Sequence, residues 1–288
     1  MDFKNTKVFN FEGALRGMRN PLNSWSKADS YYGSVNLIIP PNHDLEVAYL
    51  WVENENKIRQ KEGKKTIELE TDEWNKLWEK YDNWLLDVGI LNSNDEIADV
   101  AFLGPNDLDL AQRLIRGGPE HSKFMRQIFT TVDITAPLYW WKEADTYKVG
   151  TTANSTSTMH KLMAKPFERD DFEFDKGKEL IIAKGYITHG GEYELTYEDY
   201  INDTLYMCNR LRDKFLETND KDYWRALVQI LPNAYLQTRT WTANYAILRN
   251  IYFQRRNHKL KEWHQFCDWI KSLPYSTELI TLGDENEN

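Results

Sequence analysis

Apolar residues recur at helical spacing along this chain. After Thr71, one apolar stripe falls at positions i, i+3, i+4, i+7 and i+11: Trp74, Leu77, Trp78, Tyr81 and Leu85. A similar periodicity runs from Asp44 to about Gln60 and breaks at Gly63. Helices are therefore expected over both stretches, after a polar and aromatic region at 1–42. Within that region the run 16–30 is interpreted as an arm, with a nucleotide or subunit contact as the alternative.

The downstream half of the chain predicts more helices. One is expected from a cap at Asn106 to a stop at Gly117-Gly118. Another begins after Thr196, a third covers residues 223–230, and a long one follows near Thr240. A last helix is expected to bury one set of apolar side chains: Leu260, Trp263, Phe266, Cys267 and Ile270.

Strand signals are fewer. Residues 126–136, RQIFTTVDITA, are rich in β-branched side chains and predict a strand that ends before Pro137. Gly190-Gly191 predicts a hairpin turn. Because helices outnumber strands, the expected fold class is α+β. We expect a helical or arm-like region over 1–99, a core over 100–275 and an acidic tail over 276–288, of which the last residues, 282–288, are expected to be frayed.

Composition narrows the possible functions. The net charge of −9 disfavours a protein that coats nucleic acid, since binding the phosphate backbone requires a basic surface. No run of about 18 apolar residues occurs, so a membrane span is not expected. Only two cysteines are present, at Cys208 and Cys267, and their spacing predicts neither a disulfide framework nor a zinc site. We therefore expect a cytoplasmic location, no bound metal, and no nucleic-acid or membrane partner.

The segment 225–256 carries the most informative residues of the chain. Amide and guanidinium groups stand at spacings of six and five, at Asn244, Asn250 and Arg255. Such groups suit a planar heterocycle or a phosphate. Together with Leu231, Pro232, Tyr235, Trp241, Thr242 and Leu248, these residues resemble the C-terminal signature of the flavin-dependent thymidylate synthases. Counted from the downstream His258 and Glu262, Arg256 fits the arginine position as well as Arg255 does.

Two further segments bear on the resemblance. His121 falls on the first histidine of a family segment that precedes a strand ending in proline, although Arg126 and Gln127 replace the family's glutamate and second histidine. In the central motif, Asn154 and Ser157 match, while Tyr147-Lys148-Val149 replaces the family's Arg-His-Arg. Ser155 replaces a glutamate and Met159 an arginine. Lys148 keeps one positive charge without the planar fork of arginine.

The resemblance implies a central antiparallel sheet flanked by helices, as in thymidylate synthase-complementing proteins, and a homotetramer with sites between subunits. It implies transfer of a one-carbon unit from methylenetetrahydrofolate to C5 of dUMP or a related pyrimidine deoxynucleotide. FAD would carry the hydride and NADPH would reduce it. Arg255 would hold and polarise the nucleotide. The implied flavin contacts are His121, Asn244 and Asn250, and the implied nucleotide contacts are Lys148, Asn154, Ser155, Ser157, Arg255 and Arg256.

The substitutions in the central motif leave other interpretations open. One is a non-catalytic homologue that binds nucleotide or acts as a scaffold after losing the flavin chemistry. Another is an enzyme with an altered substrate, such as dCMP, or a different one-carbon donor. A nucleotide that binds where dUMP does not would select the altered substrate, and loss of both flavin and turnover would select the non-catalytic homologue.

Overall fold

The computed structural model describes residues 1–34, 56–57, 59–60, 63, 66, 99–175, 180–187 and 191–284. The helix expected over 71–85 lies outside these residues. So does the helix expected over 44–60, apart from 56–57 and 59–60, which are helical. Helices and antiparallel strands both occur, so the expected α+β class is confirmed. Within the described residues, no helix has the length and apolar character needed to cross a membrane.

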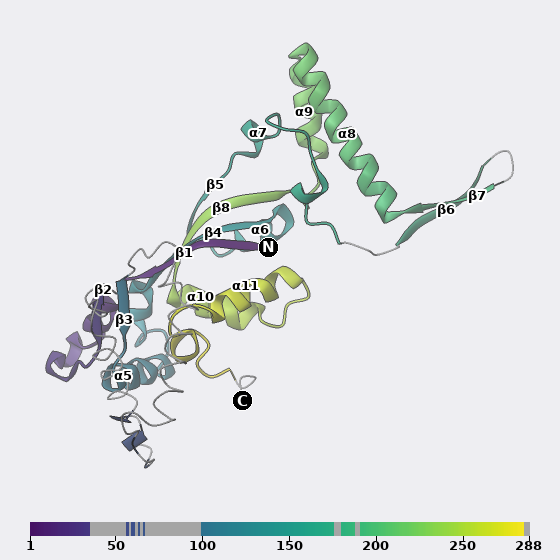
Figure 1. Ribbon diagram of the computed structural model, residues 1–288. Coiled ribbons are helices and arrows are strands. Elements are labelled where there is room, and N and C mark those ends of the chain that lie inside the picture. Colours follow the sequence, from purple (N-terminus) through teal and green to yellow (C-terminus); the bar gives the residue numbers. More distant parts are fainter. Residues whose placement is uncertain are drawn as a thin grey trace, which may run out of the picture. The chain divides into compact units, whose positions relative to one another are not determined.

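The elements follow one another along the chain as drawn in Figure 1. The strands are β1 (Asp2–Phe9), β2 (Tyr31–Ser34), β3 (Asp99–Phe102), β4 (Phe129–Pro137), β5 (Thr152–Ser155), β6 (Ile181–Ile187), β7 (Gly191–Thr196) and β8 (Leu236–Asn244). The α-helices are α1 (Phe11–Met18), α5 (Pro105–Arg116), α6 (Leu138–Ala144), α7 (Thr158–Lys161), α8 (Tyr197–Thr218), α9 (Lys221–Ile230), α10 (Tyr245–Arg255) and α11 (Lys261–Lys271). Short turns of other helix types are η1 (Asn20–Leu22), η2 (Trp25–Lys27), η3 (Lys123–Gln127), η4 (Arg169–Asp171) and η5 (Ser276–Ile280).

The strands form one larger sheet and two ribbons. The larger sheet has the order β1-β4-β8-β5. One antiparallel ribbon pairs β2 with β3, and Tyr31 lies opposite Phe102. The other pairs β6 with β7, and Ile187 lies opposite Gly191. This second ribbon has the strand pairing that the Gly190-Gly191 signal predicted.

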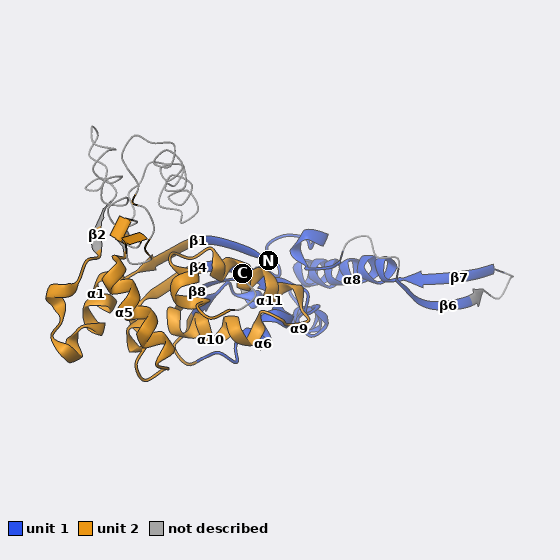
Figure 2. Ribbon diagram, turned by 90° about the horizontal axis from the view of Figure 1, so that it is seen from below, with its two compact units in different colours: residues 1–4, 133–148, 153–241 blue, residues 5–132, 149–152, 242–288 orange. Residues whose placement is uncertain are grey.

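The chain divides into two compact units, coloured blue and orange in Figure 2. Unit 1 comprises 1–4, 133–148 and 153–241, and unit 2 comprises 5–132, 149–152 and 242–288. The division falls within the strands of the larger sheet, so each strand contributes residues to both units.

Unit 2 has an aromatic core around α10 and α11. Trp263, Phe266 and Ile270 of α11 are buried, as the apolar spacing predicted. Tyr245 is fully buried at the start of α10, and its hydroxyl donates to the Pro274 carbonyl at 2.6 Å. Burial raises the pKa of Tyr245 well above its usual value, so this hydroxyl stays protonated as the donor.

A buried ion pair connects α5 with the segment after α1. Arg19 Nε donates to Asp107 Oδ1 at 2.5 Å, and the side chains are only 3% and 2% exposed. The second oxygen of Asp107 accepts from the backbone N–H groups of Asp29 and Ser30 at 3.2 and 3.0 Å. The segment 16–30 therefore packs through Arg19 into unit 2, which corrects its interpretation as a plain arm.

Unit 1 has its core between α8, α9 and the segment before β6. The cluster contains Leu162, Phe167, Phe172, Cys208 and Leu227. Helix α8 begins after Thr196, whose hydroxyl accepts from the Asp199 N–H while Asp199 accepts from Thr196. This reciprocal cap confirms Thr196 as the start of the helix. Helix α9 covers the predicted 223–230.

Several expected boundaries were wrong. The long helix expected near Thr240 begins only at Tyr245, because residues 236–244 form β8. Their alternating burial and their threonine and aromatic content suit a strand that pairs on both sides. The cap expected at Asn106 is supplied by Asp29, which accepts from the N–H groups of Asn106 and Asp107 at 2.8 and 3.0 Å.

The C-terminal segment also differs from the frayed tail that was expected. Leu279 and Ile280 are fully buried. The Arg249 guanidinium donates to the carbonyls of Ile280 and Leu282 at 2.7 and 2.9 Å. The Asp284 side chain is only 2% exposed. Residues 276–284 are therefore a packed part of unit 2, held by polar contacts from α10.

Candidate functional site at the junction of β8 and α10

Asn244 stands where β8 ends and α10 begins. Its side chain is buried, and its Oδ1 accepts from the Ile247 backbone N–H at 3.1 Å, so it is the N-cap of α10. The Tyr245 N–H donates to the Ile128 carbonyl at 3.0 Å, which fixes the junction against the residue before β4. Asn244 was expected within a helix, and the structure corrects its position to the cap.

Gly150 lies against the amide of Asn244. Its φ is +80°, a conformation that L side chains rarely adopt. A Cβ at this position would lie 3.3 Å from Asn244 Nδ2 and 3.2 Å from Ile247 Cγ1. Among the described residues, the Asn244 Nδ2 donors form no hydrogen bond. At this junction the amide donors of the buried Asn244 therefore lie beside Gly150, which has no side chain.

The other two expected residues of α10 lie on different faces of the helix. Asn250 is exposed and its Oδ1 accepts from Gln254 Nε2 at 2.8 Å. Arg255 is half-buried, with its guanidinium carbon 4.7 Å from the centre of the Trp263 ring. Five residues of an α-helix turn it by about 140° beyond a full turn, so one small ligand on one face of α10 does not reach both.

Arg256 has a structural partner. It forms an ion pair with the buried carboxylate of Asp284, which also accepts from the Tyr252 hydroxyl at 2.7 Å. Its guanidinium carbon lies 4.9 Å from the centre of the Phe253 ring. Through these contacts Arg256 holds the C-terminal segment in place. Arg255, which the register from Asn244 and Asn250 favours, stays the predicted ligand contact of the two arginines.

His121 lies in unit 2, in the turn that follows α5. It is exposed, and its ring packs over Gly117, where a Cβ would lie 3.2 Å from His121 Cδ2. Its backbone N–H donates to the Gly118 carbonyl at 3.0 Å. Helix α5 ends at Arg116, just before the stop predicted at Gly117-Gly118, and the turn that follows presents the imidazole to solvent.

The remaining expected residues lie in unit 1 on and beside an edge strand. Lys148, Asn154, Ser155 and Ser157 are all exposed. The strand β5 carries Asn154 and Ser155, and beyond it the Thr156 N–H donates to the Thr238 carbonyl of β8 at 2.9 Å. This edge presents an amide and two hydroxyls in one short stretch.

Two polar residues of β8 that the sequence analysis missed organise this edge. Gln237 is buried, and its Nε2 donates to the Thr156 carbonyl at 3.0 Å and the Thr158 hydroxyl at 3.1 Å. Arg239 donates to Gln237 Oε1 at 3.0 Å and to Asp145 at 2.7 Å, while its guanidinium lies over the Trp141 ring. The sequence signal that could have identified these two residues is the alternation of long polar side chains within a strand.

The candidate residues thus fall into two groups, each within its own unit. Unit 2 contains His121, Asn244, Asn250, Arg255 and Arg256, and unit 1 contains Lys148, Asn154, Ser155 and Ser157. Over the part of the chain that the structure describes, no group of three or more His, Cys, Asp or Glu side chains is arranged to hold a metal ion.

Neither cysteine is arranged as a nucleophile. Burial raises the pKa of the Cys208 thiol to about 11 and that of Cys267 to about 12. Both thiols therefore stay protonated at neutral pH, and the thiol is the unreactive form. The arrangement offers amide, hydroxyl, guanidinium and ammonium donors without a cysteine nucleophile.

Comparison with known proteins gives structural similarity only. The sequence matches no protein-family model and none of the curated proteins. Two solved structures of the flavin-dependent thymidylate synthase ThyX from Helicobacter pylori, in complex with FAD and dUMP, are similar, with TM-scores of 0.45 and 0.46 and 17% sequence identity. The alignments cover 62% and 64% of this chain, and 83% and 85% of those chains.

A third similar structure is the UMP/dUMP methylase PolB from Streptomyces cacaoi bound with 5-Br UMP. Its TM-score is 0.41, with 14% identity over 69% of this chain and 88% of that chain. Scores and identities at this level do not assign a family, so the functional argument rests on the residues of this chain.

Proposed function

We propose that this chain binds FAD and a pyrimidine deoxynucleotide and transfers a one-carbon unit to C5 of the nucleotide. The observation that most directly supports this proposal is the side-chain amide of the buried Asn244 at the junction of β8 and α10. Its Nδ2 donors face Gly150, which has no side chain. Buried polar side chains are usually hydrogen-bonded, and an acceptor on a ligand beside Gly150 would pair with the Nδ2 donors. The carbonyl-rich flavin ring supplies such acceptors.

The residues of unit 2 fit the flavin. Asn244 would donate to it through Nδ2, and His121 and Asn250 would donate from exposed positions. When bound, FAD supplies the hydride that converts a transferred methylene into a methyl group. The raised pKa values of both thiols agree with a reaction that uses no cysteine nucleophile.

Each group of residues includes proposed nucleotide contacts. Arg255 would hold and polarise the pyrimidine nucleotide, with Trp263 stacked on its guanidinium to fix the plane of the donors. Lys148, Asn154, Ser155 and Ser157 would donate to its phosphate and sugar from exposed positions. We propose dUMP as the nucleotide, methylenetetrahydrofolate as the donor and NADPH as the reductant. We further propose that a cytoplasmic homotetramer completes each site with residues from neighbouring chains.

A non-catalytic nucleotide-binding protein is the second candidate. Val149 is 85% exposed and Met159 is 53% exposed, at positions where the resembling family has arginines. An exposed apolar side chain cannot stabilise a negative charge that develops during catalysis. Single-turnover assays with photoreduced FAD, methylenetetrahydrofolate and dUMP separate the candidates, because the second one binds nucleotide without methylating it.

Substitution of Asn244 tests its two roles separately. Asn244→Asp keeps the Oδ1 acceptor that caps α10, so we expect the helix to keep its N-cap and the variant to fold. It removes the Nδ2 donors and adds a negative charge, so we expect the Kd for FAD to rise by about tenfold or more. Asn244→Ala should in addition lose about 1 kcal/mol of stability with the cap. Quenching of flavin fluorescence on titration measures the Kd.

The contrast between the two variants decides the role of the amide. If Asn244→Asp binds FAD as tightly as the unmodified chain, the amide serves only as a helix cap and the flavin assignment at this junction is wrong.

A further inference from the structure

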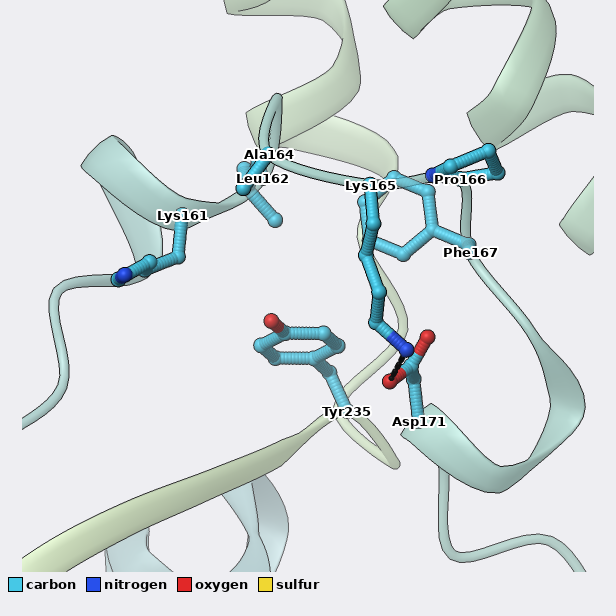
Figure 3. A pocket seen from close by; sticks show the side chains of 8 residues that line it. All are labelled: Lys161, Leu162, Ala164, Lys165, Pro166, Phe167, Asp171 and Tyr235. Carbon is cyan, nitrogen blue, oxygen red and sulfur yellow. Dashed lines mark ion pairs between the residues drawn. The ribbon is translucent and has the colours of Figure 1, made fainter.

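Unit 1 contains a cavity that includes none of the residues assigned to the flavin or the nucleotide. Its volume is about 250 Å³, and it is lined by side chains from the segment 161–171 and from the turn before β8: Lys161, Leu162, Ala164, Lys165, Pro166, Phe167, Asp171 and Tyr235. Figure 3 shows the cavity bounded by the Tyr235 ring on one side and by the Lys165 side chain on another. Both segments belong to unit 1, so the cavity lies within one compact body.

The walls of the cavity are apolar and held in place by the core. Leu162 and Phe167 are buried members of the unit 1 core cluster. The Asn209 side chain of α8 accepts from the Phe167 N–H at 2.7 Å and donates to the Phe167 carbonyl at 3.0 Å. The Tyr235 ring meets Phe167 and Phe172 edge-on, with centroid distances of 6.1 and 5.6 Å. These contacts preform the apolar side of the cavity.

The polar side chains of the cavity are mainly donors, and both oxygens of its carboxylate already accept hydrogen bonds. Asp171 is the acidic residue of the lining. Its Oδ1 pairs with Lys165 Nζ at 2.8 Å and its Oδ2 accepts from the Glu168 N–H at 2.9 Å. The Lys165 ammonium has three N–H donors; it pairs with Asp171 at 2.8 Å and more distantly with Glu168 at 3.7 Å, so at least one donor remains for a ligand. Lys161 also lines the cavity, and in Figure 3 its ammonium points away from Tyr235 and Lys165.

Tyr235 contributes a hydroxyl that stays protonated and can donate a hydrogen bond. Burial raises the pKa of its phenol, and the nearby Asp171 carboxylate raises it further. The hydroxyl is therefore protonated at neutral pH. In Figure 3 the hydroxyl end of the ring points toward the side of the cavity that Leu162 lines. No hydrogen bond from this hydroxyl occurs within the described residues.

We propose that this cavity binds a small organic carboxylate with an aromatic or compact apolar body. A dry cavity of roughly 150 Å³ admits benzene, so about 250 Å³ leaves room for a benzene-sized body and one carboxylate. The carboxylate would accept from Lys165 and Tyr235, and the body would pack on Leu162, Pro166 and Phe167. Apolar walls with a few convergent polar groups are typical of small-molecule sites.

Titration calorimetry with three probes tests this site. Benzoate has both an aromatic ring and a carboxylate. Benzyl alcohol has the ring without the negative charge, and inorganic phosphate has the negative charge without the ring. We expect benzoate to bind at least about tenfold more tightly than either, because a hydrogen bond to an ionised group is worth about that factor. If benzyl alcohol or phosphate binds as tightly as benzoate, the proposal is overturned.

Variants locate the binding. Ala164→Leu places a larger side chain at the exposed wall of the cavity and should abolish benzoate binding. Lys165→Met should weaken it about tenfold and Tyr235→Phe several-fold. Lys214→Met is the matched control, since Lys214 is an exposed lysine paired with Glu217 at 2.7 Å on α8. Circular dichroism checks that each variant is folded. Unchanged benzoate affinity in folded Ala164→Leu and Lys165→Met proteins would refute the site.

Discussion

Replacing Arg255 with alanine is expected to lower kcat/KM for dUMP methylation about 100- to 1,000-fold. Removing one positioned donor from developing negative charge typically costs this much. The structure places the Arg255 guanidinium 4.7 Å from the centre of the Trp263 ring, which restricts the plane in which its donors point. Arg255→Lys should recover only part of the activity, since an ammonium lacks the planar fork. Steady-state assays with FAD, NADPH and methylenetetrahydrofolate measure the effect.

A structural role for Arg255 predicts a different outcome. The cation–π contact with the buried Trp263 is worth about 0.5–2 kcal/mol, so losing this contact alone would lower stability and leave turnover unchanged. Arg113→Ala is the control, because Arg113 is exposed and paired only with the neighbouring Asp109 within α5. Arg255→Ala with the turnover of the Arg113→Ala control would remove Arg255 from the proposed site.

Replacing Asp107 with alanine is expected to lower the free energy of unfolding by about 3–5 kcal/mol. The substitution leaves the buried Arg19 charge without its partner, which is the costly way to break such a pair. It also removes the acceptor of the Asp29 and Ser30 N–H groups. Urea unfolding followed by tryptophan fluorescence measures the loss.

Two further variants separate charge pairing from packing at this site. Asp109→Ala, two residues along the same helix, removes an exposed partner of Arg113 and should cost less than about 1 kcal/mol. The double variant Arg19→Met and Asp107→Ala removes both charges and should be more stable than Asp107→Ala alone. If Asp107→Ala costs no more than Asp109→Ala, the ion pair does not stabilise unit 2.

Local sequence signals predicted the elements whose boundaries are set locally. The apolar spacing of α11 and a helix that begins after Thr196 were predicted from a few consecutive residues, and both occur. The strand β4 also ends at Pro137, close to its predicted end. In these cases side-chain periodicity and capping suffice to fix the element.

Long-range contacts set the features that were missed. A long helix was expected from near Thr240, yet pairing with β4 and β5 makes residues 236–244 a strand. Asn244 followed by a helix is also an N-cap signal. The cap of α5 comes from Asp29, which is 77 and 78 residues from the N–H groups it accepts. Sequence reasoning has no local signal for such a partner.

The candidate site likewise has features that the local sequence predicted and features that depend on long-range contacts. The chemical types of its residues were readable from the sequence, and the structure adds the buried setting of Asn244 and the pairing of Arg256 with Asp284. The supporting Gln237 and Arg239 were missed because their partners, Thr156, Thr158 and Asp145, are distant in sequence.

The visible absorption spectrum of the purified protein, after incubation with FAD and gel filtration, tests the central claim most directly. The proposed function predicts a flavin band that elutes with the protein in about one equivalent per chain, and a reduced amount with Asn244→Asp. A folded protein that elutes colourless after incubation with excess FAD would contradict the flavoenzyme proposal.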